Sequence, residues 1–105
     1  MNIALTIHTS QRDPQRDMLR SAYVPYVLKL GHVPVLIPNN LPDPAAYFDA
    51  LHIDALILCG GGDLDPARYG QENTHSMQLS PERDQTEWAL IDLALAREMP
   101  FLGIC

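Results

Sequence analysis

Four short apolar runs recur along the chain and do not alternate with polar positions. They read IALTI at 3–7, VPVLI at 33–37, ALILC at 55–59 and FLGI at 101–104. Strands of a parallel sheet are covered on both faces and are therefore almost continuously apolar, whereas half-exposed strands alternate. The four runs predict four parallel strands.

Helical periodicity separates the first two runs. The apolar residues spaced by three and four positions are Leu19, Ala22, Tyr23, Tyr26, Val27 and Leu30. Gly31 stands where the residue after a helix C-cap is often glycine. Pro25 lies inside this pattern and predicts an interruption with a kink, since proline lacks the N–H of a helix interior.

Two further helices are predicted from their start signals. Asp43 is a suitable N-cap for a short segment over 44–51, with proline at its first position. The last helix has Ser80 as N-cap, Pro81 at the first position and acidic residues in the first turn. Trp88, Ile91 and Leu95 form an apolar stripe along this helix, and we expect Trp88 to be a core or interface aromatic.

The order β-α-β-α-β-loop-α-β predicts an α/β fold, in which right-handed crossovers join a parallel sheet with helices on both faces. The length of 105 residues allows one small domain, and 47% hydrophobic and 19% charged residues are ordinary for a globular chain.

Charge and composition exclude several classes of function. The net charge is −6 and no basic patch is present, so we expect no nucleic-acid partner. No apolar stretch reaches the roughly 18 residues that a membrane span needs, and the start MNIALTIHTS lacks the basic region of a signal peptide. Two cysteines are too few for a disulfide framework. We therefore expect a cytoplasmic protein without a membrane partner.

Ligands of open parallel sheets bind beyond the carboxyl ends of the strands. His8 and Thr9 follow the first run, Asn39 and Asn40 the second, CGGGD at 59–63 the third, and Cys105 the fourth. Gly103 precedes Cys105 by two positions, as a small residue precedes the nucleophile in a strand-to-helix elbow. Backbone N–H groups of Gly60, Gly61 and Gly62 could stabilise an oxyanion.

Each of these features also has a purely structural interpretation. Cys105 could be a buried cysteine at a strand end, and we expect Cys59 to be one. The three glycines could form only a tight turn; a phosphate site is disfavoured because Asp63 and Asp65 follow. No histidine pair has metal-ligand spacing, so we expect no metal and no cofactor. His8 is not expected to be the catalytic base.

The stretches ILCGGGDLDPARYG and SPERDQTEWALIDLALAREMPFLGIC resemble the class I glutamine amidotransferase-like superfamily. Within it they resemble the gamma-glutamyl hydrolase branch, peptidase family C26, which includes gamma-glutamyl-gamma-aminobutyrate hydrolases of polyamine breakdown. The matching residues are Gly60 to Gly62, Asp63, Pro66, Tyr69, Gly70, Arg83, Asp84, Gly103, Ile104 and Cys105. SAYVPYVLKLGHVPVLIP also looks like the family's first helix and second strand, so the likeness covers essentially the whole chain.

The resemblance implies a flavodoxin-like three-layer fold and a Cys-His-Glu triad, in which Cys105 attacks a gamma-glutamyl amide to form a thioester. It also implies an oxyanion hole made by the Gly61 N–H and the residue after Cys105. The His and Glu of the family lie downstream, so residues 1–105 are expected to be the N-terminal part of a single domain that ends at the nucleophile. A molecule truly ending there would lack its base and half its oxyanion hole.

The leading hypothesis is therefore a cysteine hydrolase whose partner is a small gamma-glutamyl substrate. A glutaminase subunit that passes ammonia to a synthetase is one alternative, and a non-catalytic fragment or binding module is another. Arg83 and Asp84 either fix the loop against the helix start or contact a substrate carboxylate. Whether the protein forms a homodimer is left open by the sequence.

Overall fold

The computed structural model describes residues 1–10, 14–60 and 81–104. Along the chain the elements are β1 (Asn2–Thr6), β2 (His8–Ser10), β3 (Arg16–Met18), α1 (Tyr23–Lys29), β4 (Val33–Ile37), α2 (Pro44–Leu51), β5 (Ala55–Leu58), α3 (Pro81–Ala96) and β6 (Phe101–Gly103). Each of the four apolar runs forms a strand, with bounds that differ from the predicted ones by at most one residue at each end.

The main sheet is parallel and has the strand order β4-β1-β5-β6. β1 and β4, the first two strands of this sheet along the chain, are neighbours. The next two strands, β5 and β6, lie on the other side of β1. This is the beginning of the flavodoxin-like order. Pro34 lies on the edge strand β4, where a missing N–H is tolerated.

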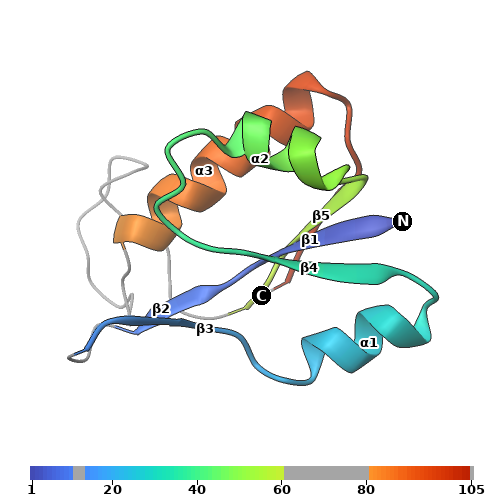
Figure 1. The fold of residues 1–105 in the computed structure, drawn as a ribbon, viewed down its shortest axis with the longest axis horizontal. Coiled ribbons are helices and arrows are strands. Elements are labelled where there is room, and N and C mark those ends of the chain that lie inside the picture. The colour runs from blue at the N-terminus through green and yellow to red at the C-terminus, as the bar shows by residue number, and fades with distance from the viewer. Residues whose placement is uncertain (11–13, 61–80, 105) are drawn as a thin grey trace.

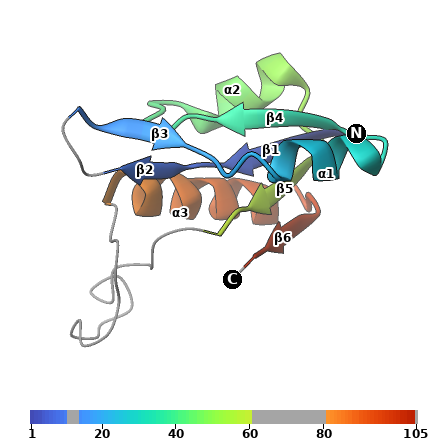
Figure 2. The same cartoon turned by 90° about the horizontal axis from the view of Figure 1, so that it is seen from below.

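Helices cover both faces of this sheet (Figures 1 and 2). In Figure 1, α2 and α3 lie above the strands and α1 lies below them. The predicted α/β class, with a parallel sheet between helical layers, is confirmed.

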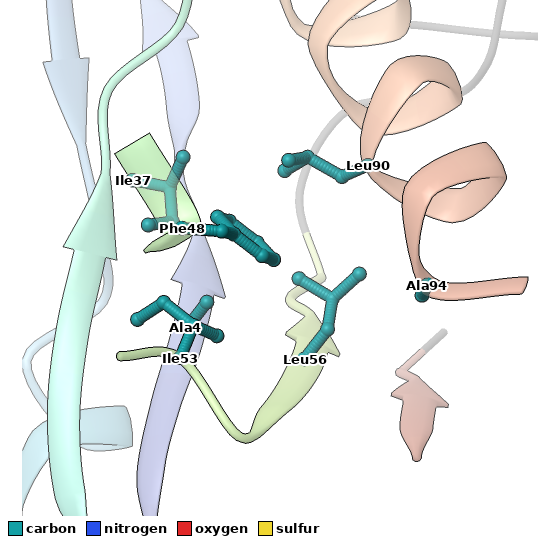
Figure 3. Close-up of a cluster of buried hydrophobic side chains, with 7 residues drawn as sticks. All are labelled: Ala4, Ile37, Phe48, Ile53, Leu56, Leu90 and Ala94. Carbon is teal, nitrogen blue, oxygen red and sulfur yellow. The ribbon is translucent and has the colours of Figure 1, made fainter. Parts of the chain in front are cut away.

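Alternate residues of the strands divide the core into two clusters. On the α2/α3 face, side chains from the strands, the helices and the segment before β5 form one cluster (Figure 3): Ala4, Ile37, Phe48, Ile53, Leu56, Leu90 and Ala94. On the α1 face the buried residues are Ile3, Leu5, Val27, Ile57 and Cys59. β1 and β5, the two inner strands of the sheet, both contribute to the two clusters and form the centre of the fold.

Local capping signals explain where the shorter helices begin and end. The Asp43 carboxylate accepts a hydrogen bond from the Ala46 N–H at 3.1 Å, as predicted for the N-cap of α2. Gly31 has φ of +83° directly after the Leu30 C-cap of α1, a conformation that favours glycine. Both helix termini follow from these residues.

The expected interruption of the first helix at Pro25 is wrong. Helix α1 begins at Tyr23, so Pro25 lies in its first turn. The N–H groups of a first turn have no partner within the helix, and a proline there removes no hydrogen bond. Leu19 and Ala22 precede the helix instead of continuing it.

The apolar stripe of the last helix is not the face that packs most closely on the sheet. Trp88 and Leu95 of α3 are 43% and 61% exposed, whereas Leu90 and Ala94 are fully buried. The buried face includes Arg83, which lies among polar residues of the first two turns. The most apolar stripe is therefore not the one that faces the sheet.

A two-stranded antiparallel hairpin, β2 with β3, was not expected. It pairs His8 with Met18 and Ser10 with Arg16, and it extends from the carboxyl end of β1 (Figure 2). Its strands are three residues long and lack an apolar run.

Within the described residues, no helix is long and apolar enough to cross a membrane.

Replacing Leu90 or Leu95 by alanine tests the reassigned face of α3. Leu90→Ala should lower the free energy of unfolding by about 2–5 kcal/mol, because it leaves a cavity in the core. Leu95→Ala is the matched control and should change it by less than about 0.5 kcal/mol. Urea unfolding of both variants measures the difference, and a larger loss for Leu95→Ala would contradict the assignment.

Candidate functional site

The carboxyl ends of the parallel strands lie at one edge of the sheet, as the sequence predicts. At this edge β5 and β6 are neighbours: Leu58 pairs with Gly103, and the Ile104 N–H donates to the Leu58 carbonyl at 2.9 Å. Gly61, Gly62 and Cys105 lie outside the described residues. The structure therefore describes the residues that lead into the glycine turn and into the cysteine, Gly60 and Ile104.

Cys59 is buried in the core at the end of β5, as expected. Its N–H donates to the Thr6 hydroxyl at 3.0 Å, and its carbonyl accepts from the Arg83 guanidinium. Burial raises the pKa of the Cys59 thiol to about 11; the positive charge of Arg83 opposes this increase and the charge of Glu87 adds to it. At neutral pH this thiol is protonated and a poor nucleophile.

Gly60, the first residue of the glycine turn, is hydrogen-bonded to helix α1, which lies on the other face of the sheet from α3. Its N–H donates to the Tyr23 hydroxyl at 2.8 Å. Tyr23 is the first residue of α1 and packs beside the cluster that contains Cys59. Of the three glycine N–H groups, that of Gly60 is thus already engaged by a side chain.

Arg83 and Asp84 are both buried in the first turn of α3. The Arg83 Nε donates to the Glu87 carboxylate, one helical turn further on, and the Thr6 hydroxyl donates to the same carboxylate at 3.3 Å. Burial raises the pKa of Glu87, although the charge and hydrogen bonds of Arg83 and Thr6 favour its ionised form. Arg83, Glu87 and Thr6 thus form one hydrogen-bond network, which bonds to the backbone of Cys59 at the end of β5.

Thr6, Glu87 and Tyr23 were not predicted from the sequence as residues of the site. One signal was present for the first: Thr6 is a hydrogen-bonding side chain inside an otherwise apolar run. For Glu87 the signal was its position four residues after Arg83, the spacing of a helical ion pair. Tyr23 carried no sequence signal beyond its helical period.

A second polar cluster joins the hairpin to the end of β4. Asp17 accepts hydrogen bonds from the Thr9 hydroxyl at 2.8 Å and from the Asn39 backbone N–H at 3.0 Å. The Asn39 side-chain amide donates to the Ile7 carbonyl at 3.1 Å and to the Thr9 hydroxyl at 2.8 Å. The carboxyl edge therefore brings together Thr9 and Asn39, as the strand order predicts.

Burial raises the pKa of Asp17, but the hydrogen bonds from Asn39 and Thr9 outweigh it, so the net pKa is lowered. For His8, burial lowers the pKa, and the positive charge of Arg83 lowers it further. The His8 Nδ1 is buried and has no hydrogen-bond partner among the described residues. Within those residues, no group of three or more His, Cys, Asp and Glu side chains is arranged to hold a metal ion.

The strand order of the parallel sheet agrees with the flavodoxin-like fold that the sequence resemblance implies. Arg83, one of the matching residues, is buried and bonds to the backbone just before the three glycines. The family model of peptidase C26 matches residues 2–105. The chain belongs to the peptidase C26 family.

Named relatives agree with this assignment. The chain is 41% identical over 103 residues to a Mycobacterium tuberculosis protein named "Putative glutamine amidotransferase", covering 94% of this chain and 33% of that protein. A Schizosaccharomyces pombe protein of the same description is 37% identical over 90 residues, 79% of this chain and 32% of that protein. The gamma-glutamyl-gamma-aminobutyrate hydrolase of Escherichia coli O157:H7 is 33% identical over 89 residues, 83% of this chain and 35% of that protein. The chain spans about a third of the length of these relatives.

The proton affinity of His8 tests the charge arrangement at this edge. We expect NMR titration to give a pKa below the usual 6.5, and Arg83→Gln to raise it because a nearby positive charge is removed. Since the folded protein binds this proton less tightly than the unfolded one, the contribution of His8 to stability should be lost as the pH falls below 6.5.

Arg97→Gln is the matched control for this titration, because Arg97 pairs with Asp49 beyond the other end of α3. It should leave the pKa of His8 unchanged. A His8 pKa at or above 6.5 in the unmodified protein, or equal shifts in both arginine variants, would contradict the assignment.

Proposed function

We propose that the protein is a cysteine hydrolase of gamma-glutamyl amides, with Cys105 as its nucleophile. The observation that carries the proposal is the pairing of β5 with β6, in which the Ile104 N–H bonds to the Leu58 carbonyl. Cys105 directly follows Ile104, and Gly60 comes two residues after Leu58. The nucleophile and the glycine turn therefore start from adjacent strand ends.

In the proposed reaction, the Cys105 thiolate attacks the gamma-carbonyl carbon of the substrate. The carbonyl oxygen becomes an oxyanion, and the backbone N–H of Gly61 is the proposed donor from the glycine turn; one such donor typically contributes about 3–4 kcal/mol. The C–N bond then breaks and the amine leaves with a proton. Water hydrolyses the remaining thioester, which releases glutamate and restores the thiol.

The proposal includes a histidine base and an acidic partner downstream of residue 105, as the family resemblance implies. They would take the proton of the thiol and deliver it to the leaving amine. Cys59 is a poor candidate for the nucleophile because it is buried and its thiol pKa is raised to about 11. No metal ion or cofactor is required by this chemistry.

A glutaminase that delivers ammonia to a synthetase is the second candidate. It is favoured by one observation: relatives named as glutamine amidotransferases reach 41% and 37% identity, compared with 33% for a named hydrolase. The resemblance of the Arg83–Asp84 helix start and of the glycine turn favours the hydrolase. The third candidate, a non-catalytic binding module, predicts no thiol reactivity at Cys105.

Labelling of the full-length protein with a glutamine-analogue chloroketone tests the nucleophile. We expect a single adduct on Cys105 by intact and peptide mass spectrometry, because an activated cysteine reacts as the thiolate. Cys59→Ala, the matched control, should retain the adduct, and Cys105→Ala should lose it and lower kcat by roughly 10⁴-fold or more. No adduct on Cys105 would leave the non-catalytic module as the better description.

Glutamate release from two substrates separates the two enzymatic candidates. The purified protein alone should turn over the gamma-glutamyl amide of 4-aminobutyrate with a kcat/KM at least roughly tenfold above that for glutamine. The opposite preference, together with ammonia release that depends on an added synthetase partner, would favour the glutaminase.

A further inference from the structure

Side chains bond to the backbone of Cys59 and Gly60 at the end of β5. The paired register of β1 and β5 ends at Leu5 and Ile57. Beyond it, the Cys59 N–H donates to the Thr6 hydroxyl and the Gly60 N–H donates to the Tyr23 hydroxyl. The Cys59 carbonyl accepts from Arg83. Three successive backbone groups are thus fixed by side chains from β1, α1 and α3.

These side chains are themselves held in place. Thr6 is 0% exposed in the central strand, and its hydroxyl donates to Glu87 while it accepts from the Cys59 N–H. A hydroxyl has one proton to donate, so its bond to Glu87 leaves a lone pair directed at Cys59. Arg83 is 5% exposed and also bonds to Glu87. One carboxylate therefore orients both side chains.

Precise placement matters for the segment that follows. An oxyanion donor acts when it lies about 2.7–3.1 Å from the position of the developing charge, and a misplacement of about 1 Å can cost roughly 100-fold in rate. Gly60 immediately precedes the proposed oxyanion donor, and a glycine backbone has the widest conformational freedom. Fixing Cys59 and Gly60 reduces that freedom at the entrance to the turn.

We propose that Thr6, Tyr23 and Arg83 are positioning residues that hold the entrance of the oxyanion-hole turn in its productive place. This inference rests on the proposed function. The three side chains do not touch the reacting atoms in this role; they act through the backbone of Cys59 and Gly60.

Kinetics of the full-length protein with gamma-glutamyl-p-nitroanilide test the role. Thr6→Val removes the hydroxyl and should lower kcat roughly 10- to 100-fold, with KM changed by less than about threefold. Thr6→Ser keeps the hydroxyl and should stay within about threefold of the unmodified enzyme. Tyr23→Phe, which deletes one oxygen, should lower kcat in the same way if Thr6→Val does not fold.

Alkylation of Cys105 by iodoacetamide distinguishes a positioning role from general damage. This substitution passes through no oxyanion, so Thr6→Val and Tyr23→Phe should alkylate within about twofold of the unmodified rate. A fall in alkylation that parallels the fall in kcat would overturn the proposal, because the variants would then have impaired the nucleophile or the fold as a whole.

Amide hydrogen exchange gives a readout that does not depend on activity. Thr6→Val should accelerate exchange of the Cys59 amide, and Tyr23→Phe that of the Gly60 amide, by at least roughly tenfold. The Leu56 amide, which bonds to the Pro100 carbonyl at 3.1 Å, is the internal control and should keep its rate. Unchanged exchange at Cys59 and Gly60 would overturn the proposal whatever the kinetics.

The combined result separates failure of this inference from failure of the proposed function. Faster exchange with an undiminished kcat would overturn the positioning role while leaving the hydrolase intact. An unmodified protein that hydrolyses no gamma-glutamyl amide would overturn the function and the positioning role together. Faster exchange with the expected loss of kcat and unchanged alkylation would support both.

Discussion

Strand β1 constrains the rest of the structure, because it is an inner strand of the sheet and has more buried residues than any other of the sheet's four strands. Four of its five residues, Ile3 to Thr6, are buried. Three are apolar and contribute to the two core clusters, but Thr6 brings a hydroxyl into the interior. A buried hydroxyl without a partner is costly, so this position must be matched by polar groups from other elements.

Those polar groups come from the two segments on either side of the glycine turn. Cys59 supplies its N–H and Glu87 supplies its carboxylate. Glu87 in turn pairs with Arg83, which bonds back to the Cys59 carbonyl. A single polar residue in the core strand thus links β5 to the start of α3, and the fold and the candidate site share the same interactions.

The same network explains how α3 is oriented. Trp88, Ile91 and Leu95 form an apolar stripe at helical spacing in its sequence. The helix instead buries Leu90 and Ala94 together with Arg83, because the polar residues of its first turns find partners at the edge of the sheet. Thr86 is one of them, and its hydroxyl accepts from the Asn40 N–H at 3.2 Å.

Local patterns along the chain predict the four parallel strands, the N-cap of α2, the end of α1 and the edge of the sheet at which the chemistry is expected. Each depends on local periodicity or on one or two neighbouring residues, which a linear pattern records. The β2–β3 hairpin, the buried face of α3 and the partners of Thr6, Arg83 and Tyr23 emerge only in the folded structure. These features depend on contacts between residues far apart in sequence, such as Thr6 with Glu87. Local sequence patterns record only interactions between neighbouring residues, so they do not show such contacts.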